Sequence, residues 1–90
     1  MNLFSPGQLV ATPGALAAAE ASGESLLEYI QRHISGDWGD ISDPDIYENL
    51  YALEHDLRLL SSYKLKNGQR IWIITEADRT STCVLLPEEY

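Results

Sequence analysis

Two histidines and three arginines are the residues of this sequence whose chemistry could support catalysis without a metal ion. His33 and His55 could act as a general base, and Arg58, Arg70 or Arg79 could stabilise the charge on a reacting phosphate. A metal-independent ribonuclease needs this combination, together with an acid for the leaving oxygen. Hydroxyl groups that could orient the phosphate belong to Ser62, Thr75 and Thr82.

The placement of the histidines and the distribution of charge argue against this chemistry. His33 and His55 fall in the last turns of predicted helices, where a histidine commonly interacts with the helix dipole. The net charge is −8, and residues 1–56 carry one arginine against ten acids, a formal −9. Because affinity for phosphates comes mainly from Lys and Arg, nucleic acid is not an expected partner. The ribonuclease hypothesis is kept as the alternative, with His33, His55, Arg58 and Arg79 as its catalytic candidates.

The GDWGD segment could be read as a calcium loop, but the spacing fails. With Asp37 as the first ligand, the third and fifth positions are Gly39 and Ile41, which offer no side-chain oxygen. A single cysteine, Cys83, cannot form an internal disulfide, and the two histidines are too far from it in sequence for a zinc motif. We therefore expect no metal and no cofactor. Trp38 is either a hydrophobic plug in this turn or an exposed recognition anchor.

The composition is that of an ordinary soluble domain. Ninety residues with 44% hydrophobic and 22% charged residues form one core. No run approaches the roughly 20 apolar residues of a membrane span, so no membrane association is expected. The first residues lack the basic stretch of a secretion signal, and a cytoplasmic location is expected.

Three helices are predicted in residues 12–56. Thr12-Pro13 and Asp43-Pro44 each combine a capping side chain with a proline suited to the first turn. Ser25 and Glu28 form a capping box at the start of the second helix. The apolar stripe predicted for that helix is formed by Leu26, Leu27, Ile30 and Ile34.

From residue 57 onward the apolar period changes to two, which predicts a β-sheet. Asn67-Gly68 favours a two-residue turn that places Tyr63 opposite Trp72. A third strand follows from Thr82 to Leu86. The predicted fold is a single α+β domain over 1–90, with three helices packed on one face of a three-stranded antiparallel meander. Its parts are an N-terminal arm (1–11), a helical half (12–56) and an antiparallel sheet (57–90).

This register sorts the strand residues onto two faces. The helix-covered face is expected to carry Leu59, Ser61, Tyr63, Leu65, Trp72, Ile74, Cys83 and Leu85. The second face is expected to carry Arg58, Leu60, Ser62, Lys64, Ile71, Ile73, Thr75, Thr82, Val84 and Leu86. Aliphatic side chains beside hydroxyls and cations make the second face a candidate partner or dimer surface, or a shallow site partly covered by the N-terminal arm.

Four segments give the chain a family resemblance: GDWGD (36–40), LLSSY (59–63), IWIITEADR (71–79) and LLPEEY (85–90). Together they resemble a family of small bacterial proteins described as plasmid-related and found with mobile or integrated elements. The resemblance covers nearly the whole chain and implies no established activity. The third helix departs from the family's basic and polar pattern at Tyr47, Asn49 and Tyr51. More distantly, the architecture is similar to small ribonuclease toxins of the barnase and RelE type.

The sequence therefore favours an accessory or interaction protein of a mobile element. It would act by binding an unknown protein partner or a second copy of itself, through the second sheet face and the 77–81 turn. The candidate binding residues are Trp38, Arg70, Ile73, Arg79, Thr80 and Thr82.

Overall fold

A computed structural model describes residues 2–90 and contains three α-helices and a four-stranded mixed sheet. The α+β class is confirmed, and the number of strands is one greater than predicted. The elements are β1 (Gln8–Ala11), α1 (Pro13–Ser22), α2 (Leu26–Ile34), α3 (Asp43–His55), β2 (Leu59–Lys64), β3 (Arg70–Thr75), β4 (Ser81–Leu85) and the 3-10 turn η1 (Pro87–Glu89).

Each helix begins at a hydroxyl side chain that accepts a main-chain N–H. Thr12 Oγ1 accepts from Ala15 N at 3.0 Å, and Ser25 Oγ accepts from Leu27 N at 3.3 Å. Thr12 and Ser25 are the predicted caps, but the capping box predicted for Ser25 and Glu28 is not formed, because Ser25 Oγ accepts from Leu27 N rather than from Glu28 N. The third helix begins at Asp43, one residue earlier than predicted, because Ser42 rather than Asp43 is the capping residue.

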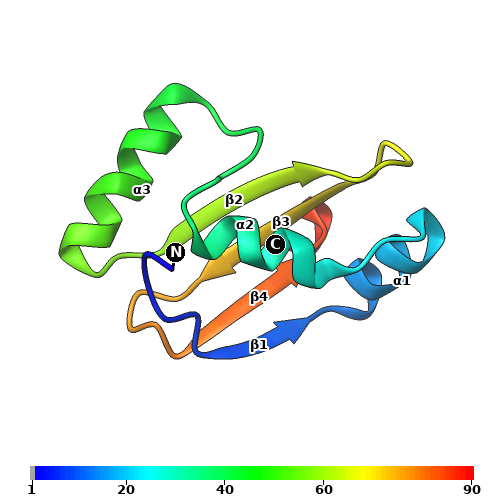
Figure 1. The fold of residues 1–90 in the computed structure, drawn as a ribbon, viewed down its shortest axis with the longest axis horizontal. Helices are drawn as coiled ribbons and strands as arrows, with labels where there is room; N and C mark the ends of the chain where they lie inside the picture. The colour runs from blue at the N-terminus through cyan, green and yellow to red at the C-terminus, as the bar shows by residue number, and fades with distance from the viewer. Residues whose placement is uncertain (1) are drawn as a thin grey trace.

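The strand order in the sheet is β1-β4-β3-β2 (Figure 1). Strands β2, β3 and β4 form the predicted antiparallel meander, but β1 pairs in parallel with β4. The prediction of a purely antiparallel sheet was wrong for this reason. Residues 8–11, expected in an N-terminal arm, are therefore an edge strand of the sheet.

The predicted hairpin register was wrong by one residue. Tyr63 pairs with Ile71, and Trp72 pairs with Ser62. The loop has three residues rather than two: Leu65 N donates to Gln69 O at 2.7 Å and Gly68, at φ 90°, closes the turn. Because side chains alternate along a strand, this shift moves every β3 side chain to the opposite face from the one predicted.

The helix-covered face consequently carries a different set of side chains. Its core is formed by Ala15 and Ala18 of α1, Tyr29, Ile30 and Ile34 of α2, and Tyr63, Leu65, Ile71, Ile73 and Val84. A second cluster under α3 joins Trp38, Ala52 and Leu59. Trp72, predicted for the core, lies on the other face, where its ring meets that of Tyr90 edge-on.

Among the described residues, no helix has the length and apolar character needed to cross a bilayer. Those residues also bring together no group of three or more His, Cys, Asp or Glu side chains suited to a metal ion.

Candidate functional site

The outer edge of β2 is closed by its own chain. The side-chain amide of Asn49 accepts from Leu60 N at 3.1 Å and donates to Leu60 O at 2.7 Å. Two residues further on, Ser62 N donates to Trp38 O at 3.1 Å, and Asp40 N donates to Ser62 O at 2.7 Å. Four main-chain groups that would otherwise be free at a sheet edge are thus satisfied.

The GDWGD segment provides half of this cover. Gly39 forms an isolated parallel bridge with Ser62, and a Cβ on Gly39 would lie 2.1 Å from Ser62 O. Only glycine fits this approach, and its φ of 73° is also one that other residues rarely adopt. Trp38 holds the segment in place because its side chain is buried in the second cluster.

The outer edge of β1 is open. Gln8 N donates to Thr80 O and Thr12 N donates to Val84 O, both at 2.9 Å. Since main-chain groups alternate in direction along a strand, Leu9 and Ala11 point their N–H and C=O groups away from β4. Within residues 2–90, no group is hydrogen-bonded to them on that outer side, and no other element lies beyond β1 in Figure 1.

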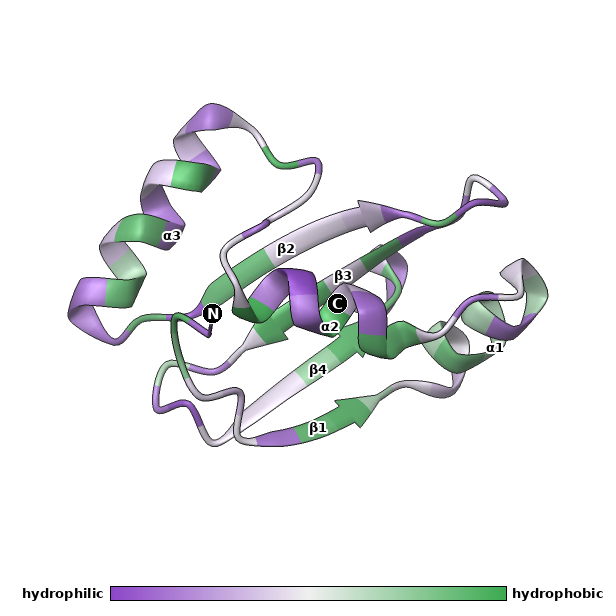
Figure 2. Ribbon diagram, viewed as in Figure 1, coloured by the Kyte–Doolittle hydropathy of each residue, from purple (hydrophilic) through white to green (hydrophobic). Residues whose placement is uncertain are grey.

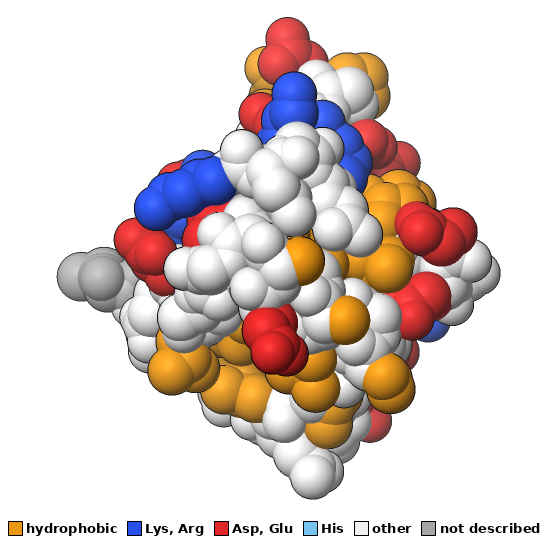
Figure 3. Space-filling model, turned by 90° about the vertical axis from the view of Figure 1, so that its right-hand side faces the viewer, with side chains coloured by type: hydrophobic (Ala, Val, Ile, Leu, Met, Phe, Trp, Pro, Cys, Tyr) orange, Lys and Arg blue, Asp and Glu red, His pale blue; other side chains and the backbone are white. Residues whose placement is uncertain are grey.

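An apolar groove of about 420 Å³ lies beside this open edge, between β1 and helices α1 and α2. Leu9, Leu16 and Leu27 line it and are 45%, 55% and 64% exposed. Figure 3 looks onto the end of the molecule formed by α1 and the β2–β3 hairpin. Hydrophobic side chains gather in the lower part of this view, whereas Lys and Arg gather in its upper part. The hydrophobic stretch of β1 is also visible along the ribbon in Figure 2.

The charged side chains that line the groove are acidic. Glu20 and Glu24 belong to its lining, and no Lys or Arg does. Hydrogen bonds from Ser22, Tyr29 and the main-chain N–H of Lys66 lower the pKa of Glu24, so this carboxylate stays ionised. The only side-chain charges in residues 1–31 are those of Glu20, Glu24 and Glu28.

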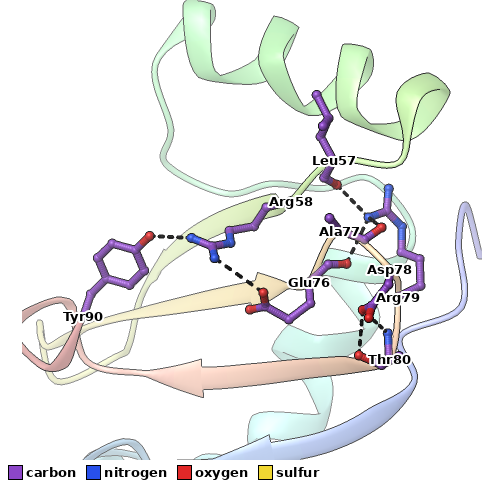
Figure 4. A network of polar contacts seen from close by, with 8 residues as sticks. All are labelled: Leu57, Arg58, Glu76, Ala77, Asp78, Arg79, Thr80 and Tyr90. Carbon is purple, nitrogen blue, oxygen red and sulfur yellow. Dashed lines mark hydrogen bonds and ion pairs between the residues drawn. The ribbon is translucent and has the colours of Figure 1, made fainter.

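Arg79, a candidate in both functional readings, is committed to internal contacts. Its Nη1 donates to the carbonyl oxygens of Leu57 (2.6 Å), Glu76 (3.1 Å) and Ala77 (3.2 Å). Its Nη2 donates to Ala52 O at 3.0 Å in the last turn of α3, a carbonyl that also accepts from Leu57 N. The guanidinium therefore ties the β3–β4 turn to the end of α3 (Figure 4).

Other residues of this region also find their partners within the chain. Arg58 donates to the phenol oxygen of Tyr90 at 2.6 Å and forms an ion pair with Glu76 at 3.4 Å. Thr80 donates its N–H and its hydroxyl to the Asp78 carboxylate, which lowers the pKa of Asp78 (Figure 4). The 77–81 turn is thus organised by local bonds.

His33 lies at the centre of a buried chain of hydrogen bonds. Its Nδ1 lies 2.5 Å from Ser61 Oγ, and its Nε2 lies 2.9 Å from Thr75 Oγ1. Thr75 Oγ1 is 2.7 Å from Thr82 Oγ1, which donates to Pro6 O at 2.8 Å. The four side chains are at most 1% exposed.

The carbonyl at the end of this chain fixes every proton in it. Thr82 donates to Pro6 O, so Thr75 must donate to Thr82 and accept from His33 Nε2–H. Nδ1 then carries no proton and accepts from the Ser61 hydroxyl. Burial lowers the pKa of His33 to about 4, because the neutral ring is favoured away from water. This histidine is structural, and solvent does not reach its base nitrogen.

The remaining predicted site residues are dispersed. Ile73 is fully buried in the main core, so its assignment to the second face was wrong. Trp38 is 6% exposed, as a hydrophobic plug would be. Thr82 belongs to the buried chain of His33.

Arg70 and His55 remain partly accessible, at separate places. Arg70 donates to Ser62 Oγ at 2.9 Å and lies 3.6 Å from the Asp40 carboxylate. His55 stacks on Tyr51 and is bonded to its carbonyl at 3.0 Å through Nδ1. The ribonuclease hypothesis gains no support from this arrangement, since Arg58 and Arg79 have internal partners and His33 is buried.

None of the residues that line the groove was predicted as a binding residue. Leu27 was placed in the buried stripe of the second helix, but it is 64% exposed, more than Leu9 or Leu16. The helical pattern gave no warning of this, since positions 26, 27, 30 and 34 all fit a single apolar stripe.

The chain matches no protein-family model, and no similar curated protein or solved structure is found.

Proposed function

We propose that this protein is a small accessory protein that acts by binding another protein, and that its binding surface is the β1 edge with the adjoining apolar groove. The proposal rests on one observation: free main-chain groups and exposed apolar side chains lie next to each other. Main-chain groups of β1 point outward without partners, and exposed leucines of α1 and α2 lie beside them.

The contrast between the two sheet edges supports this choice. The fold uses Asn49 and the 38–40 segment to cover the β2 edge. An exposed sheet edge can template pairing with another chain, and proteins commonly cover such edges. A binding role gives a reason for leaving the β1 edge uncovered beside an apolar groove.

The second sheet face and the 77–81 turn are not retained as the binding surface. Ile73 lies on the helix-covered face, and Ile74 and Leu85, which the observed register places on the second face, are only 6% and 7% exposed. The guanidinium of Arg79 is used inside the fold.

The proposal is tested by capture of partners from a bacterial lysate on the immobilised full-length chain. Leu27→Lys places a charge in the groove at an exposed position, so it should fold normally. Leu50→Lys is the matched control, because Leu50 is 47% exposed on α3 and does not line the groove.

We expect at least one protein to be enriched by the wild-type chain and by Leu50→Lys, and lost with Leu27→Lys. Quantitative mass spectrometry of the three eluates measures this. Eluates that do not differ between wild type and Leu27→Lys would contradict the proposed surface.

A further inference from the structure

We infer that the occupant of the groove is an extended segment of a different protein, which pairs with β1 as a fifth strand and carries Lys or Arg beside a short apolar stretch. This inference rests on the proposed function and specifies the partner's chemistry.

The outward groups of β1 require an extended main chain. Leu9 and Ala11 each offer one N–H and one C=O at the same edge, and residues two apart in a strand are separated by about 6.6 Å. Another strand presents free groups at that spacing. A helix does not, because its N–H and C=O groups are bonded within the helix.

The length of the added strand is limited at both ends of β1. Pro13, the next residue after Ala11 that would point outward, has no N–H to donate, and Gly7, at φ 66°, ends the extended main chain on the other side. Pairing is thus confined to the four-residue strand Gln8–Ala11. The incoming segment needs only a short extended stretch, with apolar side chains at alternate positions.

The groove determines which side of that stretch is apolar. Leu9 pairs with Thr82 and Ala11 with Val84, so both side chains lie on the helix-covered face beside α1 and α2. Alternate side chains of an added strand would point to the same face and meet Leu16 and Leu27.

The charge of the groove selects the partner. Glu20 and Glu24 belong to its lining, with no cation among the lining residues. A second copy of the chain would bring the same two carboxylates to the interface, together with a net charge of −8. Lys or Arg next to the apolar stretch would instead be attracted, and would raise the association rate.

The inference is tested with a phage-displayed library of random dodecapeptides selected on the immobilised full-length chain. Wild type, Leu27→Lys and Leu50→Lys are selected in parallel. We expect wild type and Leu50→Lys to enrich peptides that alternate apolar with polar residues and carry Lys or Arg at one or both ends. Enrichment should fall about tenfold or more with Leu27→Lys, since a charge would lie in the apolar groove.

Strand pairing is then measured directly with the most enriched peptide, made synthetically. Amide hydrogen exchange of the full-length chain should show Leu9 and Ala11 slowed by the peptide. Val10, whose N–H faces β4, should change little. Replacing alternate peptide amides by N-methyl amides should abolish the protection, whereas methylating the intervening amides should not.

Several results would overturn the inference. Enriched peptides that are helical, acidic or equally retained by Leu27→Lys would do so, as would binding that leaves Leu9 and Ala11 in fast exchange. A concentration-dependent dimer in sedimentation that protects these amides without peptide would make the occupant a second copy. The proposed function is tested separately, by whether Leu27→Lys abolishes capture of a protein from the lysate.

Discussion

The buried histidine makes the stability of this protein depend on pH in a defined window. His33 accepts from Ser61 through Nδ1, so a second ring proton would displace that donor in a site without solvent. The pKa of His33 is about 4 in the folded chain, against 6.5 for an unperturbed histidine. Between these values the unfolded state binds more protons than the folded state. Stability is therefore fully present above pH 6.5 and falls as the pH decreases toward 4.

The size of the effect follows from the same two values. A difference of one pKa unit corresponds to about 1.4 kcal/mol, so lowering the pH from 7 to 4 should remove about 3 kcal/mol of folding free energy through His33 alone. That is a large part of the stability of a chain of this size.

Urea unfolding followed by tryptophan fluorescence measures the effect at several pH values. His33→Gln keeps a polar side chain of similar reach but cannot titrate. Carboxylates with lowered pKa values, such as Glu24 and Asp78, also make the folded state less stable in acid, but they do so equally in wild type and variant. The difference between wild type and variant therefore isolates His33.

The wild type should lose about 3 kcal/mol more than His33→Gln between pH 7 and 4. An NMR titration of His33 in the wild type provides a second measurement that does not depend on the variant folding. A pKa near 6.5, or equal losses for the two proteins, would refute the assignment of His33 as a neutral, buried acceptor.

Three further substitutions test other parts of the fold by urea unfolding. Asn49→Ala should cost about 2–3 kcal/mol, because it leaves two main-chain groups of β2 without partners; Glu48→Ala, exposed on the same helix, should cost little. Gly39→Ala should cost more than Gly23→Ala: both have positive φ, but only at Gly39 would a Cβ meet the neighbouring strand, and equal costs would contradict the close approach. Arg79→Ala should cost about 2 kcal/mol through loss of its carbonyl contacts, and a change below about 0.5 kcal/mol would show that they are dispensable.

The sequence was sufficient for elements that are specified locally. Thr12 and Ser25 cap the helices at which they were predicted, because a cap depends on residues three positions away or fewer. The meander follows from the change of period after residue 57. Trp38 was predicted as either a hydrophobic plug or an exposed binding residue, and it is buried.

The hairpin register could not be read from its two central residues. Asn67-Gly68 is compatible with a two-residue and a three-residue loop, since both place glycine at a positive φ. The three-residue loop lets Lys66 N donate to the Glu24 carboxylate and Asn67 N donate to Ser22 Oγ. These contacts come from the α1–α2 connection, which no local pattern relates to the hairpin.

Strand β1 was missed because its pairing is remote. Four residues are too few to show an alternating pattern, and Gln8 pairs with Ser81 at the other end of the chain. The groove depends on that pairing, so its site could not be predicted either. For His33 the sequence favoured a contact with the helix dipole over a catalytic role. Its buried hydrogen bonds to Ser61 and Thr75 come from strands remote in sequence, so no local pattern predicts them.

The difference between the two sheet edges is tested most directly by amide hydrogen exchange of the free protein. Leu60 and Ser62 of β2 should exchange slowly, with protection of about a thousandfold or more, because their N–H groups are bonded to Asn49 and Trp38. Leu9 and Ala11 of β1 should exchange close to the rate of an unfolded chain. Equally strong protection of Leu9 and Ala11 in the monomer would show that the β1 edge is closed, and would contradict the binding surface proposed for this protein.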